Sequence, residues 1–428
     1  MVREKIDIEK AWEILFDRHD IAAQVSSNGS FRISANQINS IKEARLMAKF
    51  DQSSQLPNIF HKNNLSILPV TRGEYIIGPF LTHEKINYPS VKPEPVEIPK
   101  KWQTLDHTNL YSEASTLLFA YNSGIIKDAL ECSEVAFTVN GRMSSGNFDY
   151  EIDNRNDLNT REKITVQNAQ IEIDAGYESQ DKFYICEAKN IAVEEILIRQ
   201  LYYPYRLWSR KISKPVVPVF LVFSNDVFHI FIYEFKDRQI YNSIKLLKYK
   251  AYTFADEEIL FQEVVSLWED ISLVDKPQTT FPQADSFERI LDLVSILAEK
   301  NLTRDEVTFK YEFDPRQTNY YISACEYLGL IERCENADGE REYKLSTVAQ
   351  KIMTEQYKQK HLMLMQKILE NPVFHKTFDL TIKSGRIPDR QTICQIMGDC
   401  NLSINPTTID RRASTVRSWI DWILRLSV

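Results

Sequence analysis

Two short apolar segments of this chain end in side chains that could hold a metal or move a proton. The first, residues 171–174, reads IEID, and the second, residues 185–189, reads ICEAK. Side chains alternate faces along a strand, so Glu187 and Lys189 are expected to project to the same side. A hairpin joining the two segments, with a turn around residues 176–181, would bring Asp174 beside Glu187. Two carboxylates and an ammonium would then converge.

Buried carboxylates need a partner, because burying a charge is costly unless it is paired or coordinates a metal. A divalent cation is an economical partner for Asp174 and Glu187. Mg²⁺ takes one or two carboxylates with waters and phosphate oxygens, and it lowers the pKa of a bound water. Lys189 could orient or deprotonate that water. The alternative is that Glu187 and Lys189 form an exposed cross-strand ion pair.

The chain has 428 residues, a length that predicts several domains, and clusters of prolines indicate where the domains are separated. Pro89, Pro93, Pro95 and Pro99 predict a semi-rigid linker, and a second break falls at residues 276–283. The region before the linker, 1–100, is expected to be an α+β domain that could contact DNA. Its expected elements are helices near 8–16 and 35–50, the latter with Lys42, Arg45 and Lys49 on one face, and a strand at 75–77.

The middle region, 101–275, has the pattern of an α/β core. A helix, then strands, then a crossover helix leading to an almost wholly apolar strand predicts a central mixed sheet flanked by helices. The expected helices are 109–130 and 192–209, and the expected strands are 135–139, 170–174, 183–188, 216–223 and 228–233.

Asp174, the thirteen-residue step to Glu187, and the run Glu187-Ala188-Lys189 resemble the PD-(D/E)XK signature of many Type II restriction endonucleases. The resemblance implies a restriction-endonuclease-like core. Asp174, Glu187 and the main-chain carbonyl of Ala188 would hold Mg²⁺, and Lys189 would position the attacking water. The family places an acid on its first helix, which Glu113 would supply. A solvent-facing helix acid is the alternative for Glu113.

The segment QLYYPYR, which begins at Gln200, resembles the Gln/Tyr-bearing helix that lies beside the active site in some family members. Gln200 and Tyr205 are therefore candidate DNA contacts, with packing as the alternative. Residues 191–250 carry ten basic against five acidic side chains. Arg206 and Arg210 are accordingly expected to follow a DNA backbone, unless this stretch is an ordinary solvated face.

The region 276–356 resembles a winged-helix domain, with three helices from residue 287 to 328 and a hairpin from 329 to 345. In that resemblance the third helix enters the major groove. Residues 281–350 carry eight basic against fourteen acidic side chains, so a structural or protein-binding winged helix is the alternative. The residues expected to meet base edges are Arg316, Gln317, Asn319 and Tyr320.

The last region, 357–428, is expected to be helical and to form a second helix-turn-helix-like unit. A helix over 408–426 places Ile409, Ala413, Val416, Ile420 and Ile423 inward. Trp419 and Trp422 are expected to be core residues. The DNA-contacting candidates on this helix are Arg411, Arg412 and Arg417.

The resemblance covers residues 59–78, the middle region and the segment DPRQTNYYISACEYLGLIE. It implies a sequence-specific, Mg²⁺-dependent endonuclease of a restriction-modification system, which cuts double-stranded DNA to leave 5′-phosphates beside a cognate DNA methyltransferase. One departure is Ile173, where the family motif has proline; many members share it. Because one site cuts one strand, a homodimer or sequential nicking is expected. The alternatives are a non-enzymatic winged-helix DNA-binding regulator and a structure-specific DNA repair nuclease.

Composition and sequence pattern argue against a membrane protein, an exported protein and a zinc-ribbon protein. No segment reaches the roughly 18 apolar residues of a spanning helix, so no membrane association is expected. The charged start after Met1 carries no export signal, which makes the cytoplasm the expected location. Six cysteines without a C-x-x-C pair predict reduced thiols and no zinc ribbon. The net charge of −8 disfavours nucleic acid when taken alone, so any DNA-binding surface must be local.

Overall fold

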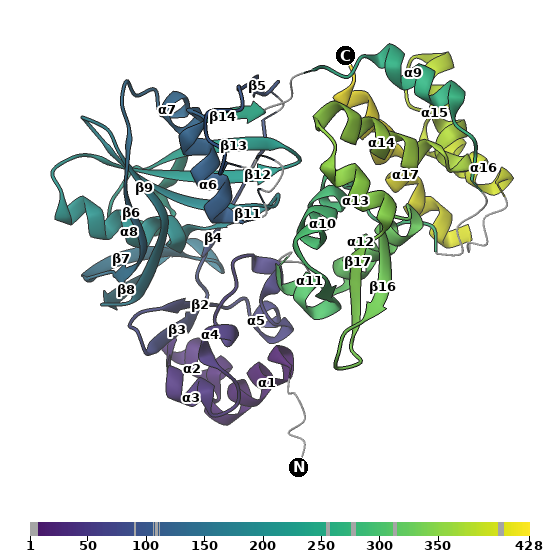
Figure 1. Cartoon of the computed structure of the whole chain (residues 1–428). Coiled ribbons are helices and arrows are strands. Elements are labelled where there is room, and N and C mark those ends of the chain that lie inside the picture. The colour runs from purple at the N-terminus through teal and green to yellow at the C-terminus, as the bar shows by residue number, and fades with distance from the viewer. Residues whose placement is uncertain are drawn as a thin grey trace.

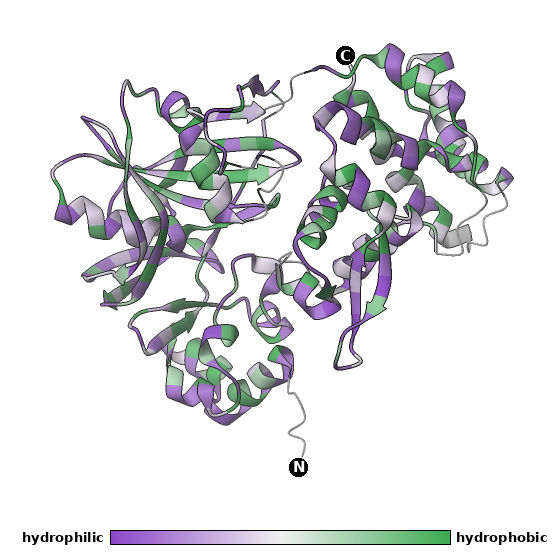
Figure 2. Cartoon of the chain, viewed as in Figure 1, coloured by the Kyte–Doolittle hydropathy of each residue, from purple (hydrophilic) through white to green (hydrophobic). Residues whose placement is uncertain are grey.

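The computed structural model describes residues 7–89, 91–105, 107, 110, 112–253, 257–274, 280–310, 315–400 and 406–428. Figure 1 shows short helices and strands of the N-terminal part at the bottom, a large sheet at the left and a mainly helical C-terminal part at the right. In Figure 2, hydrophobic residues follow the central strands and the inner helix faces. Within these ranges no helix is long and apolar enough to cross a membrane.

The N-terminal part combines short helices with a small antiparallel sheet in the order β1-β3-β2. Edge-to-face contacts among Trp12, Phe16 and Phe60 lie at its core. Its elements are α1 (Ile8–His19), α2 (Ile21–Asn28), β1 (Phe31–Ser34), α3 (Ala35–Asn39), α4 (Ala44–Met47), η1 (Ser53–Gln55), α5 (Asn58–Lys62), β2 (Ser66–Pro69) and β3 (Glu74–Gly78).

The single helix expected over residues 35–50 is wrong. The chain turns between α3 and α4, and the Asn39 side chain accepts the N–H of Ala44 at 2.7 Å, which satisfies one of the N–H groups left unpaired at the start of α4. Lys42 lies between the two helices, Arg45 lies on α4 and Lys49 follows it, so the three do not share one helix face.

A seven-stranded mixed sheet forms the middle of the chain, in the order β5-β14-β13-β12-β10-β9-β6. β10 pairs with β12 in parallel and with β9 in antiparallel orientation, and every residue of β10 is buried. The prediction of a central mixed sheet with flanking helices is confirmed. The strands are β5 (Glu94–Pro95), β6 (Ala136–Ser144), β9 (Gln170–Glu178), β10 (Phe183–Lys189), β12 (Val216–Ser224), β13 (Val227–Phe235) and β14 (Ile244–Thr253).

Helices lie on both faces of this sheet. On one face, α6 (Glu113–Asn122) and α7 (Ile125–Ala129) pack against Tyr177 and Cys186. On the other face, side chains of α8 (Ile198–Lys211) pack against Phe183 and Ile185.

Two helix boundaries differ from those expected. Gly124, with φ of +86°, separates α6 from α7, because a left-handed residue cannot continue a helix, and Asn109 lies outside the described residues. The helix expected from residue 192 begins only at Ile198. The preceding residues form β11 (Glu195–Leu197), which pairs with β4 (His83–Lys85).

A long hairpin of β7 (Asn147–Asn154) and β8 (Asp157–Gln167) was not predicted. Alternation along β7 buries Phe148, Tyr150 and Ile152. Phe148 and Tyr150 make edge-to-face contacts with Tyr202 and Tyr203 of α8. The hairpin therefore supports α8 from the side opposite the sheet.

Over residues 287–345 the C-terminal part has three helices and a hairpin, as expected. An unpredicted strand, β15 (Leu302–Thr303), joins the hairpin in a sheet of order β15-β17-β16. The other elements are α9 (Phe261–Asp270), α10 (Phe287–Glu299), α11 (Arg304–Lys310), α12 (Pro315–Tyr327), β16 (Ile331–Glu335), β17 (Arg341–Leu345), α13 (Thr347–Thr354), α14 (Tyr357–Leu369), α15 (Pro372–Ser384), α16 (Arg390–Asp399) and α17 (Pro406–Leu426).

One hydrophobic core spans both expected C-terminal regions. Phe287 contacts Trp419 and Trp422, with ring centroids 5.3 and 4.2 Å apart, and Phe281 stacks on Phe374. Trp419 and Trp422 are 0% and 2% exposed, which confirms them as core residues. The apolar residues expected to face inward from α17 are likewise buried or partly buried.

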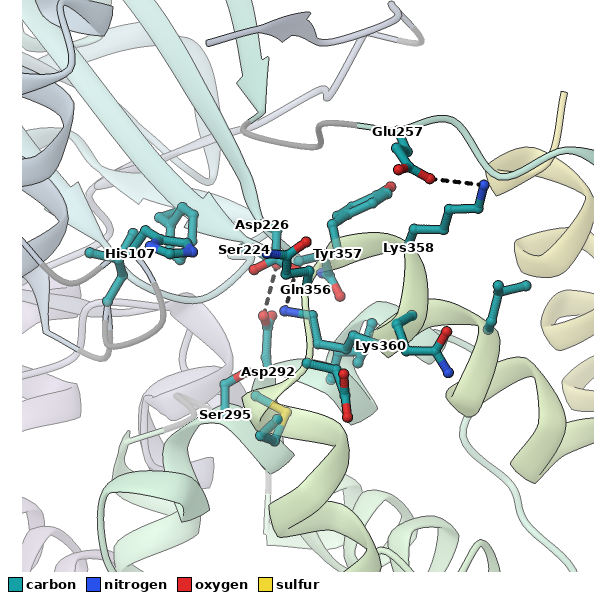
Figure 3. A pocket seen from close by; sticks show the side chains of 18 of the residues that line it. His107, Ser224, Asp226, Glu257, Asp292, Ser295, Gln356, Tyr357, Lys358 and Lys360 are labelled. Carbon is teal, nitrogen blue, oxygen red and sulfur yellow. Dashed lines mark hydrogen bonds and ion pairs between the residues drawn. The ribbon is translucent and has the colours of Figure 1, made fainter. Parts of the chain in front are cut away.

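A cavity of about 490 Å³ lies where the sheet meets the C-terminal part, and Figure 3 shows its charged lining. The buried Asp292 of α10 accepts hydrogen bonds from Ala192 N at 2.9 Å and from Ser224 Oγ at 2.8 Å. The turn between β12 and β13 contributes Asp226, which pairs with Lys360 of α14. Because these lining charges pair with one another, we interpret the cavity as a joint between the two parts.

Candidate active site

The hairpin of β9 and β10 brings the two acidic segments together. The turn is closed by Ser179, whose N–H donates to the Lys182 carbonyl at 2.9 Å and whose Oγ accepts the Lys182 N–H at 3.1 Å. Gly176, expected near this turn, lies within β9. A Cβ on Gly176 would come within 2.8 Å of Val139 Cβ and 2.9 Å of the Phe183 ring, so close packing requires glycine there.

β9 and β10 part just before the acids. Their described pairing ends with Cys186 opposite Ala175. One step further, Asp174 Oδ2 accepts the N–H of Ala188 at 2.9 Å. The Asp174 side chain, rather than a backbone carbonyl of β9, accepts this N–H, which fixes Asp174 beside the Glu187-Ala188 peptide.

An irregularity in β9 falls at the same place. Val139 of β6 pairs with Gly176, whereas Gly141 pairs with Ile173, so β9 carries one residue more than β6 between these pairs. Asp174 and Ala175 together lie opposite Asn140 and form a bulge. Bulges bend a strand and redirect its side chains, and they are frequent beside active sites.

Glu187 and Lys189 share one side of β10, as predicted. Lys189 Nζ lies 3.1 Å from Glu187 Oε1 and 3.5 Å from Glu113 Oε1 of α6. Glu187 Oε1 also accepts a hydrogen bond from Gln200 Nε2 of α8. Both β10 residues are 7% exposed. The pair is therefore buried, unlike the exposed ion pair that was the alternative.

The acids have raised pKa values, mainly because they are buried. Burial, and next the charge of Asp174, raise the pKa of Glu187 well above its ordinary value. Burial also raises the pKa of Asp174, against the hydrogen bond from Ala188 N. The pKa of Glu113 is raised by burial and lowered in part by Lys189. Additional positive charge at this place would stabilise the ionised carboxylates.

The donor set suits a hard divalent cation. Across the part of the chain that the structure describes, no three His, Cys, Asp or Glu side chains are grouped so as to hold a metal. Mg²⁺ needs fewer protein ligands than three, because one or two carboxylates together with waters suffice. The carboxylates of Asp174 and Glu187, with the carbonyl of Ala188, offer only oxygen ligands, and a bound cation would lower the pKa values that burial raises.

One acid near Lys189 was not predicted. Asp51, after α4, is 5% exposed, and its Oδ2 lies 3.8 Å from Lys189 Nζ. No local motif marks Asp51, because only the docking of the N-terminal part against the sheet brings it to this site.

The cavity between the sheet and the C-terminal part is not at this cluster. Its lining includes Asn190, directly after Lys189, but not Asp51, Glu113 or Glu187. The geometry of the acids, rather than cavity size, therefore defines the candidate site.

The residues expected to contact DNA from α8 have different surroundings. Gln200 bonds to Glu187 within the site, and Tyr205 is partly buried against the core. Arg206 is 6% exposed, and its guanidinium lies 4.8 Å from the centre of the Phe148 ring. The expectation that Arg206 follows a DNA backbone is therefore wrong. Arg210 is exposed, and its Nη1 donates to a carbonyl of β7.

The four candidate side chains of α12 are exposed, as expected of groove-reading residues. Gln317 Oε1 accepts from Arg289 Nη1 at 3.5 Å, and Asn319 Oδ1 accepts from Arg304 Nε at 2.7 Å. These contacts within the C-terminal part would have to be exchanged before the two amides could meet bases.

The arginines of α17 are not equivalent. Arg411 and Arg417 are exposed, and Arg417 Nη1 donates to the Pro388 carbonyl at 3.3 Å. Arg412 is half-buried, and burial lowers its pKa while nearby Tyr320 raises it. Arg412 therefore lies close enough to Tyr320 of α12 for the two side chains to interact electrostatically.

Comparison with known proteins gives three family matches, each described as a domain of unknown function. They are DUF6996 over residues 9–77, DUF6997 over residues 78–253 and DUF7226 over residues 289–428. No curated protein and no solved structure matches the chain. The matched ranges follow the N-terminal part, the sheet and the C-terminal part; Glu113, Asp174, Glu187 and Lys189 lie within the second, and Asp51 lies within the first.

Proposed function

We propose that this protein is a Mg²⁺-dependent, sequence-specific endonuclease for double-stranded DNA, of the Type II restriction enzyme kind. The observation that carries the proposal is the meeting of Asp174, Glu187 and Lys189 where β9 and β10 part. The order of helix α6, hairpin β9–β10, crossover helix α8 and parallel strand β12 also supports a PD-(D/E)XK core.

Each residue has a proposed role in hydrolysis. Asp174, Glu187 and the Ala188 carbonyl would hold the metal, and Glu113 would act beside them. A bound Mg²⁺ supplies a water of lowered pKa and stabilises charge on the phosphate. Lys189 would position that water for attack on phosphorus. The bond from phosphorus to the 3′ oxygen breaks, which leaves a 5′-phosphate and a 3′-hydroxyl.

Sequence selection is assigned to the C-terminal part. The order helix, strand, helix, helix and hairpin over α10 to β17 is that of a winged helix, and α12 would then enter the major groove. Its exposed Arg316 and Gln317 suit guanine and adenine edges. A homodimer would cut both strands, and a cognate DNA methyltransferase would protect the host.

A second candidate is a DNA-binding regulator without catalysis. The winged-helix order and the exposed side chains of α12 favour it equally. In that case the sheet would serve for dimerisation, and the buried acids would have only a structural role.

Incubation of plasmid DNA with the purified protein and Mg²⁺ separates these functions. Discrete fragments that disappear with EDTA and with Lys189→Ala support the endonuclease. Retarded but intact DNA supports the regulator. Cutting only at forks or mismatches, without a fixed fragment pattern, supports a repair nuclease and contradicts sequence-specific restriction. A Lys163→Ala protein is the matched control, because Lys163 is an exposed lysine of β8.

A further inference from the structure

The N-terminal part contributes a carboxylate to the candidate active site. Asp51 Oδ2 lies 3.8 Å from Lys189 Nζ and 3.9 Å from Lys49 Nζ, and the Asp51 side chain is 7% exposed. Lys189 therefore faces acids from three separate places: Glu187 on its own strand, Glu113 at the start of α6, and Asp51 from another part of the fold.

Direct hydrogen bonds to the sheet hold the Asp51 segment in place. The Gln52 amide donates to the Glu195 carbonyl at 2.9 Å. The N–H and Oγ of Ser53 donate to the two Glu195 carboxylate oxygens at 3.0 and 2.9 Å. Glu195 begins β11, immediately before α8, which carries Gln200 into the site. The position of Asp51 is thus coupled to the elements that position Glu187.

The second and third acids matter because a lysine side chain is flexible. An ammonium carries three donors on a four-carbon stem, so one carboxylate does not define its direction. Glu187 Oε1 already accepts from Gln200 as well as Lys189. Asp51 and Glu113 place negative charges within ion-pair distance of Lys189 and do not draw on Glu187, the proposed metal ligand. Together the three acids restrict where Lys189 Nζ can lie.

We propose that Asp51 is a positioning residue of the candidate site, which holds the Lys189 ammonium in the direction needed for the attacking water. The inference rests on the proposed endonuclease function and deepens it, because it makes the N-terminal part a requirement for the cleavage step. DNA binding itself does not need this carboxylate.

Single-turnover cleavage by the full-length protein tests the inference. Asp51→Asn is expected to slow cleavage by about 10- to 100-fold, as misplacement of a reacting group does, with an unchanged half-saturating DNA concentration. Asp51→Glu should recover part of the rate. Ser53→Ala, which keeps Asp51 but removes one anchoring bond, should give a smaller loss. Glu74→Gln, an exposed acid of the same part paired with Arg32, should cleave like the wild type.

A second measurement does not depend on metal or cleavage. Urea unfolding without Mg²⁺ is compared for the wild type, Asp51→Asn, Lys189→Met and the double variant. The inference expects Asp51→Asn to shift the midpoint differently in the two Lys189 backgrounds, since paired charges are not additive.

The outcomes separate the two claims. An active wild type with full activity in folded Asp51→Asn overturns the inference alone, as does a loss confined to DNA binding or an additive unfolding cycle. A wild type that cuts no DNA overturns the proposed function, whereas a non-additive cycle would still establish the contact between Asp51 and Lys189.

Discussion

The candidate site on the sheet and helix α12 of the C-terminal part place their charged and polar residues in opposite ways. In the sheet, Glu187 and Lys189 are 7% exposed and face one another across short distances. On α12, Arg316 and Gln317 are exposed. Buried charge fixes geometry at a cost in solvation, which suits a chemical step, whereas exposed polar side chains can exchange partners, which suits recognition of a surface. The comparison predicts that substitutions in the two regions affect different measurements.

The largest effect is expected at Glu187. Glu187→Gln keeps the shape and removes the charge proposed to hold the metal, so cleavage should fall by about 10³-fold or more. DNA binding should persist, because the exposed side chains of α12 are unchanged. Single-turnover cleavage and a gel-shift titration measure the two properties. Equal losses of cleavage and DNA binding in Glu187→Gln would contradict the assignment of the chemical step to the sheet and of recognition to α12.

The next effect concerns the shared C-terminal core. Trp419→Ala removes contacts with Phe287 and Phe374 and the bond from Nε1 to the Ala284 carbonyl, so unfolding should become easier by about 3–5 kcal/mol. Because one core joins residues 276–356 and 357–428, the Trp419→Ala variant should unfold both regions together at a lower urea concentration than the wild type. Trp102→Ala, at a 48% exposed site, is the control. Separate transitions for 276–356 and 357–428, with only one moved, would contradict a shared core.

Asp292 predicts a pH dependence at the joint between the regions. Burial raises the pKa of Asp292 to about 7, so the folded state keeps a proton that the unfolded state releases near pH 4. The stability contributed by this proton is complete below about pH 4 and is lost as pH rises towards about 7, amounting to a few kcal/mol. Asp292→Asn should flatten that slope. Unfolding midpoints from pH 4 to 8 measure it, and identical slopes in both proteins would refute the prediction.

The smallest effect is expected on α12. Arg316→Ala or Gln317→Ala should weaken binding to the cognate sequence by about 1–3 kcal/mol per base contact, with little effect on other sequences. Competition binding with cognate and scrambled duplexes measures this difference. Lys383→Ala, an exposed lysine paired with Asp379 on α15, serves as the control. A uniform loss over all sequences would make these residues backbone contacts instead.

The sequence was most informative where polar residues interrupt apolar strands. Glu187 and Lys189 are two residues apart in an apolar strand, and side chains alternate along a strand, so their shared side of β10 could be predicted. The central mixed sheet was equally predictable, since the apolar runs of β10 and β12 require cover on both faces. Strand β7 also has an alternating pattern of buried residues, Phe148, Tyr150 and Ile152, although no strand is predicted there.

Other features depend on contacts distant in sequence. Asp51 lies beside Lys189 only because the N-terminal part docks against the sheet, and the hydrogen bond from the Ala44 N–H to Asn39 spans the turn between α3 and α4. Arg206 illustrates the reverse case. A basic residue in a basic stretch suggests solvent, yet the aromatic rings of β7 and α8 enclose it. Exposure of single charged residues is decided by such packing and not by local composition.

The bond between Ser53 and Glu195 joins residues 142 positions apart. During synthesis on the ribosome, the segment that carries Asp51 is complete long before its anchor exists. Asp51 therefore cannot be anchored at the site until β11 has emerged and the earlier segment has folded back onto it. A nascent chain halted before residue 195 would lack this anchor, so the placement of Asp51 at the site depends on synthesis of β11.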